Sequence, residues 1–161
     1  MVQFCRAVLL DAGHTLIGYL DACVKLRHRA WIGDDFVQGV ERLLSVPTRV
    51  VWTGRQEPLY GTAETVGSLV APQRGFVGQY LINHDKRVYV DKATVLENGD
   101  RYRIHPLPVL TAEGPVYGVR LDDGRLSGNT ALAGSWARDR ISVSPDVPTG
   151  FEQLIFDLVA S

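Results

Sequence analysis

The chain has 161 residues, with 17 basic and 18 acidic side chains and a formal net charge of -1. This length suits one domain, and 45% hydrophobic with 22% charged residues are proportions typical of a folded protein, so we expect a single domain over residues 1–161. The near-neutral charge argues against an extended nucleic-acid partner, because such binders carry an excess of cations to neutralise phosphates.

The start of the chain and its cysteines favour a cytoplasmic protein. The apolar run 7–10 is too short for the core of a signal peptide and ends at Asp11. No stretch approaches the roughly 20 apolar residues that span a bilayer, so we expect no membrane partner. Cys5 and Cys23 are too few for a disulfide framework, and neither they nor the scattered histidines have metal-ligand spacing. We therefore expect neither a metal nor a cofactor.

The first half of the chain predicts strands around one well-defined helix. Residues 4–10 predict a buried strand, paired as a hairpin with a strand over 14–20. A helix is predicted over 34–45, with Asp34 or Asp35 as its N-cap and Pro47 beyond its end. Its apolar face consists of Phe36, Val37, Val40, Leu43 and Leu44. A strand over 49–53 follows, and then a short second helix over 62–70.

The second half is rich in short strands. Residues 80–83 and 87–90 predict a hairpin around a turn at 84–86, and Asn98-Gly99 marks a turn before 102–104. A third hairpin is expected over 116–127, then a loop over 127–135 and late strands at 141–144 and 154–159, with a terminal helical turn as the alternative for 154–159. Because helices and strands are segregated, we expect an α+β fold: a mainly antiparallel, curved sheet covered by one or two helices.

The motif Leu9-Leu10-Asp11-Ala12-Gly13 resembles the first motif of the haloacid dehalogenase-like hydrolases. The resemblance implies a phosphate-ester hydrolase with Asp11 as nucleophile and a parallel sheet with crossover helices. Thr53, Lys92 and Asp122-Asp123 follow in a compatible order. However, Gly13 stands where the family has its second aspartate, so protonation of the leaving group has no evident source. The later hairpins also argue against a parallel sheet, so we favour a protein that is not an enzyme and keep the hydrolase as an alternative.

Arginine lies close to each of the three tryptophans. An indole offers a flat face to a base or sugar, and a guanidinium offers a bidentate fork to a phosphate or carboxylate. Trp136, Arg138 and Arg140 follow the Gly- and Ser-rich loop, and two arginines on one strand face can share an anion. The competing interpretation makes the tryptophans core anchors with arginines along their rims. The candidate ligand-binding residues are Arg29, Trp31, Trp52, Arg55, Trp136, Arg138 and Arg140.

Two stretches, 80–86 and 134–143, resemble segments of small bacterial and bacteriophage proteins; this implies a prokaryotic or phage context but no particular activity. The leading hypothesis is therefore a binding module for a small anionic ligand such as a nucleotide. The alternatives are a hydrolase that acts through Asp11 and a phage-type module that inhibits a host factor by binding a protein partner.

Overall fold

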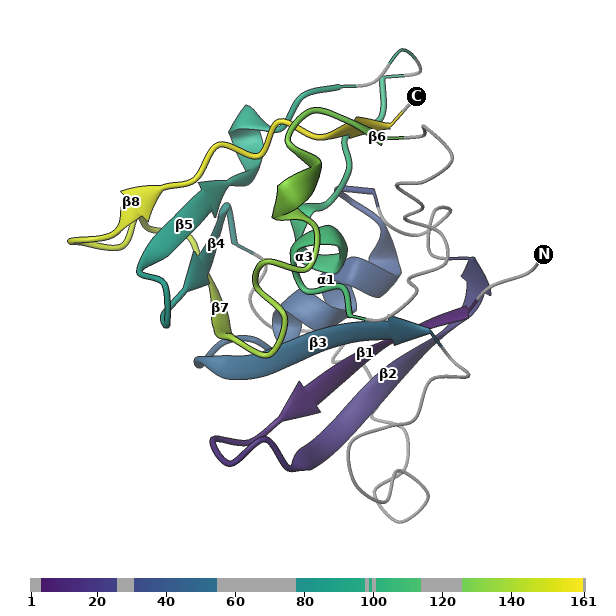
Figure 1. The fold of residues 1–161 in the computed structure, drawn as a ribbon, viewed down its shortest axis with the longest axis vertical. Coiled ribbons are helices and arrows are strands. Elements are labelled where there is room, and N and C mark those ends of the chain that lie inside the picture. The colour runs from purple at the N-terminus through teal and green to yellow at the C-terminus, as the bar shows by residue number, and fades with distance from the viewer. Residues whose placement is uncertain are drawn as a thin grey trace.

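The computed structural model describes residues 4–25, 31–54, 78–97, 99, 101–113 and 126–160, and it has an α+β fold (Figure 1). In the described part, seven strands form one open sheet in the spatial order β2-β1-β3-β7-β4-β5-β8. These strands are β1 (Phe4–Leu10), β2 (Leu16–Lys25), β3 (Thr48–Gly54), β4 (Tyr80–Asn83), β5 (Val88–Asp91), β7 (Arg140–Ser144) and β8 (Glu152–Gln153). All neighbours pair antiparallel except β5 and β8, which confirms the expected fold class.

Two α-helices are present in the described part, and local sequence accounts for both starts. Helix α1 (Asp35–Arg42) begins after Asp34, whose Oδ2 accepts a hydrogen bond from the Phe36 N–H at 2.8 Å, as the N-cap prediction required. Helix α3 (Pro106–Leu110) was not predicted; it includes Pro106 and Pro108. Proline is compatible with the first turn of a helix, where its missing N–H would have no partner in any case.

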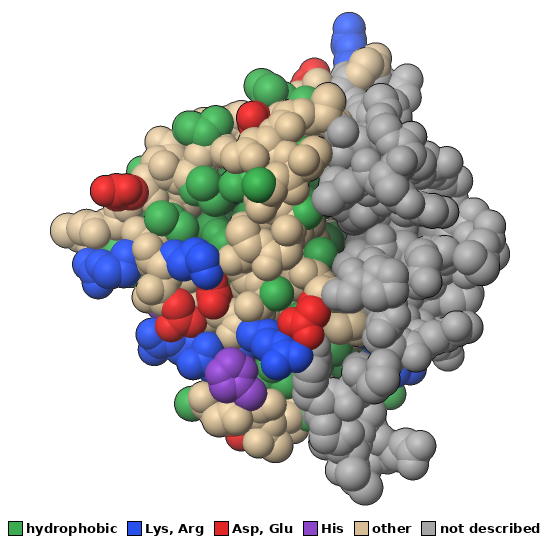
Figure 2. Space-filling model, in the orientation of Figure 1, with side chains coloured by type: hydrophobic (Ala, Val, Ile, Leu, Met, Phe, Trp, Pro, Cys, Tyr) green, Lys and Arg blue, Asp and Glu red, His purple; other side chains and the backbone are tan. Residues whose placement is uncertain are grey.

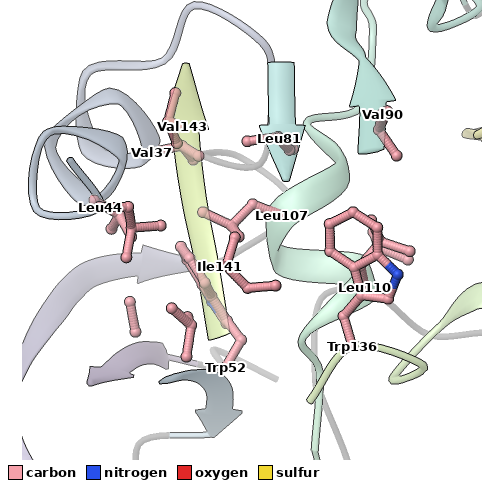
Figure 3. Packing of buried hydrophobic residues seen from close by; sticks show 14 of the residues in the cluster. Val37, Leu44, Trp52, Leu81, Val90, Leu107, Leu110, Trp136, Ile141 and Val143 are labelled. Atoms are coloured by element: carbon pink, nitrogen blue, oxygen red, sulfur yellow. The ribbon is translucent and has the colours of Figure 1, made fainter. Parts of the chain in front are cut away.

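The main core lies on the face of the sheet that carries both helices. Trp52 of β3 and Ile141 of β7 point toward Leu107 and Leu110 of α3, with Trp136 beside them (Figure 3). Alternation along β1 sends Ala7 and Leu9 into this core, while Val8 and Leu10 lie in a second buried cluster with Leu16 and Val51. The β1–β3 part of the sheet is therefore buried on both faces.

The hairpin predictions have mixed outcomes. β1 and β2 form the first hairpin, and β4 and β5 form the second around a turn at 84–87, as expected. The expected partner of 125–127 and the short helix over 62–70 lie outside the described residues. In the structure β6 (Leu126–Ser127) pairs with β9 (Val159–Ala160), so only the end of the expected strand over 154–159 forms a ladder. No helix of the described part is long and apolar enough to cross a bilayer.

Candidate functional site

Basic and acidic side chains gather where the start of β3, the β4–β5 turn and the segment before β7 meet. Figure 2 shows Lys and Arg interleaved with Asp and Glu on the visible face. We call this group the polar cluster; its members are Arg49, Asp85, Lys86, Glu113, Arg138, Asp139 and Arg140. Four cations face three carboxylates, so the cluster has one surplus positive charge.

Asp85 is the centre of the cluster. Its Oδ1 accepts a hydrogen bond from Arg140 Nε at 2.8 Å, and its Oδ2 accepts one from the Arg140 backbone N–H at 2.8 Å. Arg49 Nη1 lies 3.4 Å from the same Oδ2. Partial burial works to raise the pKa of Asp85, but the hydrogen bonds from Arg140 and the charges of Arg140 and Arg49 outweigh it and lower that pKa. The carboxyl is therefore ionised throughout the neutral range.

Strand β3 positions the second ion pair of the cluster through its backbone. The Arg138 N–H donates to the Val50 carbonyl at 2.8 Å, and the Glu113 N–H donates to the Trp52 carbonyl at 2.9 Å. This brings the two side chains together, and Arg138 Nε and Nη2 donate to the two Glu113 oxygens at 2.8 and 2.6 Å. The backbone of Arg138 has φ 67°, an uncommon conformation for a non-glycine residue, and Arg49 Nη1 donates to its carbonyl at 2.9 Å.

The third pair ties the β4–β5 turn to the segment before β7. Lys86 Nζ lies 2.5 Å from Asp139 Oδ2, which also accepts from Asn83 Nδ2 at 2.9 Å. The Asn83 side chain in turn accepts from the Asp85 and Lys86 N–H groups at 3.0 and 2.8 Å. The turn that presents Asp85 is thus fixed by its own side chains.

A histidine and a serine lie beside the cluster. His84 Nε2 and Ser142 Oγ are 2.7 Å apart, and the imidazole packs edge-on against Phe151. Burial, helped by the charge of Arg140, lowers the pKa of His84, so the ring is neutral at pH 7. Ser142 is 7% exposed, and the hydrogen bond satisfies a hydroxyl that has little access to solvent.

None of the three tryptophans belongs to the polar cluster. Trp52 and Trp136 are 0% and 1% exposed, so neither presents a flat face to a ligand. Trp31 is half-buried and packs against Tyr102 with ring centroids 5.2 Å apart. Arg138 and Arg140 do lie together in the polar cluster, but only Arg140 belongs to β7, because Arg138 lies in the preceding turn. Arg29 and Arg55 lie outside the described residues.

The hydrolase-like motif is a hairpin turn in the structure. Asp11 Oδ1 accepts from the Gly13 and Thr15 N–H groups, each at 2.9 Å, and so orders the turn between β1 and β2. β1 pairs antiparallel with both of its neighbours, which differs from the parallel sheet that the resemblance implies. Asp122 and Asp123 lie outside the described residues.

A buried charged group was missed by the sequence analysis. Glu41 of α1 is 0% exposed, and its Oε1 lies 2.5 Å from Lys92 Nζ and 3.1 Å from His105 Nε2. His105 Nδ1 accepts from the Leu107 N–H at 3.1 Å, so the ring proton must be on Nε2 and is donated to Glu41. We call Glu41, Lys92 and His105 the buried triad. The sequence signal for this buried charge was Glu41 itself, a glutamate within the otherwise apolar face of the predicted helix.

Electrostatics support an ion pair with a neutral histidine in the buried triad. Burial works to raise the pKa of Glu41, but the hydrogen bonds from His105 and Lys92 and the charge of Lys92 prevail and lower it. Burial lowers the pKa of His105 despite the opposing effect of Glu41. The triad joins α1, the 3-10 turn Lys92–Thr94 and the N-cap of α3, so it stabilises the packing of these elements.

Neither a metal site in the described part nor a similar known protein adds evidence on function. Within the described part, no group of three or more His, Cys, Asp or Glu side chains is arranged to hold a metal ion. No family model, curated protein or solved structure matches the chain, so its own side chains carry the evidence on function.

Proposed function

We propose that the protein is a binding module for a small anionic ligand and that the polar cluster is its binding site. The carrying observation is the convergence of Arg49, Arg138 and Arg140 on one face, where Asp85 and Glu113 orient them. A guanidinium that is already held in position loses less conformational freedom when it binds an anion. As proposed, the module acts in the cytoplasm.

Arg140 supplies the contact most open to a ligand. Its side chain is 46% exposed, and its Nε is occupied by Asp85. Among the residues that the structure describes, its two terminal nitrogens have no hydrogen-bond partner. Lys86, whose side chain is 48% exposed and pairs with Asp139, adds a further cation from the β4–β5 turn. These donors suit the charged part of a ligand; a nucleotide would be held by its phosphates, since Trp52 and Trp136 are buried.

The carboxylates of the cluster limit the expected affinity. Every cation of the cluster already has a carboxylate partner, so a ligand anion must share or replace that partner. A single charge-assisted hydrogen bond contributes about 1.5–3 kcal/mol. Loss of the Arg140 donors should therefore weaken binding by roughly tenfold to hundredfold.

The test is a thermal-shift screen of nucleotides, phosphorylated metabolites and small carboxylic acids at constant ionic strength, with calorimetry on each hit. Arg140→Ala should bind the hits at least about tenfold more weakly than the parent. The matched control is Arg101→Ala, because Arg101 is exposed and takes no part in the polar cluster. If no compound binds, or if Arg140→Ala and Arg138→Ala bind every hit as tightly as the parent, the proposal is wrong.

A further inference from the structure

The Asp85 carboxylate fills a position that is built like a binding site for an anion. Three N–H donors surround it: Arg140 Nε on Oδ1, and the Arg140 backbone N–H with Arg49 Nη1 on Oδ2. The two donors of Arg140 meet different oxygens of one planar group, each at 2.8 Å. One guanidinium N–H and one backbone N–H thus bind both oxygens of the carboxylate, as two parallel N–H groups do in a bidentate arginine–carboxylate pair.

Two of the three donors, Arg49 Nη1 and the Arg140 backbone N–H, are held in place by contacts that do not involve Asp85. Arg49 Nη1 also donates to the Arg138 carbonyl at 2.9 Å, and Arg49 Nε donates to the Ala12 carbonyl at 3.4 Å. The Arg140 backbone is fixed by pairing of β7 with β3 and by its carbonyl, which accepts from the His84 N–H at 2.9 Å. The position would therefore keep the Arg49 Nη1 donor and the Arg140 backbone N–H if the Asp85 side chain left it, while Arg140 Nε would be free to bind an incoming anion.

Asp85 can leave by rotation of its side chain alone. It lies in the β4–β5 turn, its backbone N–H is bound by Asn83, and its side chain is 27% exposed. Rotation toward solvent requires no change in the sheet. The Asp85 carboxylate is then hydrated, and the external anion accepts hydrogen bonds from the same three donors. The exchange therefore replaces charge-assisted hydrogen bonds to Asp85 by charge-assisted hydrogen bonds to the anion.

We propose that Asp85 is an internal competitor for the anion site and that the ligand presents a carboxylate which takes its place. This rests on the proposed function and narrows the ligand to a small carboxylic acid. In the parent protein the Asp85 carboxylate already accepts the hydrogen bonds of this position. A simple carboxylate must displace it and therefore binds more weakly. A natural ligand gains affinity from further contacts, such as those with Lys86 and the outer nitrogens of Arg140.

The experiment measures formate and acetate binding to Asp85→Ala and to the parent by thermal shift and calorimetry. Chloride keeps the ionic strength constant, so screening of charges is the same in each sample. Asp85→Ala should bind formate and acetate at least about tenfold more tightly than the parent, because the internal carboxylate no longer competes. Its lowered melting temperature should also recover as formate is added. Equal affinity for the two proteins would overturn the proposal.

Two further variants control for unspecific attraction. Asp146→Ala removes an exposed carboxylate outside the polar cluster and should gain little formate affinity. In Asp85→Ala combined with Arg140→Lys, the Nε donor is lost and the gain should disappear. If Asp85→Ala does not fold, Asp85→Asn removes the negative charge but keeps one acceptor oxygen, so it should show a smaller gain in formate affinity over the parent. Tighter binding of phosphate than of formate by Asp85→Ala would contradict the carboxylate assignment.

The two proposals fail in different ways. If Asp85→Ala binds formate and the parent binds nothing in the screen, the internal competition stands and the proposed function falls. If the parent binds an anion through Arg140 and Asp85→Ala shows no gain for formate, the function stands and the role of Asp85 is wrong.

Discussion

Replacing Glu41 by alanine removes the shared acceptor of the buried triad. In the parent, the Glu41 Oε1 atom receives hydrogen bonds from Lys92 Nζ and His105 Nε2, and both Glu41 and His105 are 0% exposed. The variant leaves a lysine whose side chain is 12% exposed without its counter-charge. It also leaves an imidazole N–H without an acceptor, because the hydrogen bond from Leu107 prevents a switch of tautomer.

The expected loss follows from these two consequences. Breaking a buried ion pair by removal of one partner costs about 3–5 kcal/mol. Lys92 can extend its ammonium to water through its exposed fraction, which reduces the cost. The unsatisfied His105 N–H contributes about 1–3 kcal/mol of the penalty. We therefore expect Glu41→Ala to lower the free energy of unfolding by about 3–4 kcal/mol. Glu41→Gln keeps an acceptor for His105 and should cost about half as much.

Urea denaturation measured by tryptophan fluorescence is a suitable assay, because Trp52 and Trp136 are 0% and 1% exposed and report loss of the core. Glu97→Ala is the matched control, since Glu97 is exposed, and it should change stability by less than about 0.5 kcal/mol. A loss below about 1 kcal/mol for Glu41→Ala, or equal losses for the alanine and glutamine variants, would refute the structural role of the triad.

Four other predictions follow from the same structure. Since burial lowers the pKa of His105, the unfolded chain binds a proton that the folded chain excludes; stability should fall as the pH drops from about 7.5 to about 5.5, and His105→Gln should reduce this slope in urea titrations. Leu44→Ala should cost about 2–5 kcal/mol in the same assay, because Leu44 is 0% exposed in the main core; a cost under about 0.5 kcal/mol would place this face outside the core. Gly134→Ala should lower the melting temperature, since Gly134 has φ 75° and its added Cβ would lie 2.9 Å from a backbone carbonyl; an unchanged melting temperature would contradict this. Finally, we expect no magnesium-dependent phosphatase activity, and turnover of a phosphate ester that Asp11→Asn abolishes would revive the hydrolase hypothesis.

Local patterns in the sequence were sufficient for most of the sheet and for α1. The β4–β5 hairpin and the Asp34 cap depend on residues close in sequence, so the pattern identified them. Helix α3 could not be recognised, because His105 caps it with an imidazole nitrogen and its five residues include two prolines. The pairing of β6 with β9 joins segments far apart in the chain, and no local pattern specifies such a partner.

The candidate site was predicted only in part. Arg138 and Arg140 were singled out from their place after the loop, and the structure brings them into one cluster. Their carboxylate partners could not be identified, because Asp85 and Glu113 lie 55 and 25 positions away in sequence from Arg140 and Arg138. Whether an indole is exposed also depends on tertiary packing.

The distribution of the main core along the chain has a consequence for biosynthesis. Ala7 and Leu9 belong to the same buried cluster as Phe156 and Leu158, so the cluster unites segments made early and late. On the ribosome, the β1–β2 hairpin can form soon after it emerges and α1 and β3 can join it, but the cluster is complete only when Phe156 and Leu158 have been made. A nascent chain stopped before Phe156 would leave part of the main core uncovered, and we expect such fragments to need chaperones or to be degraded.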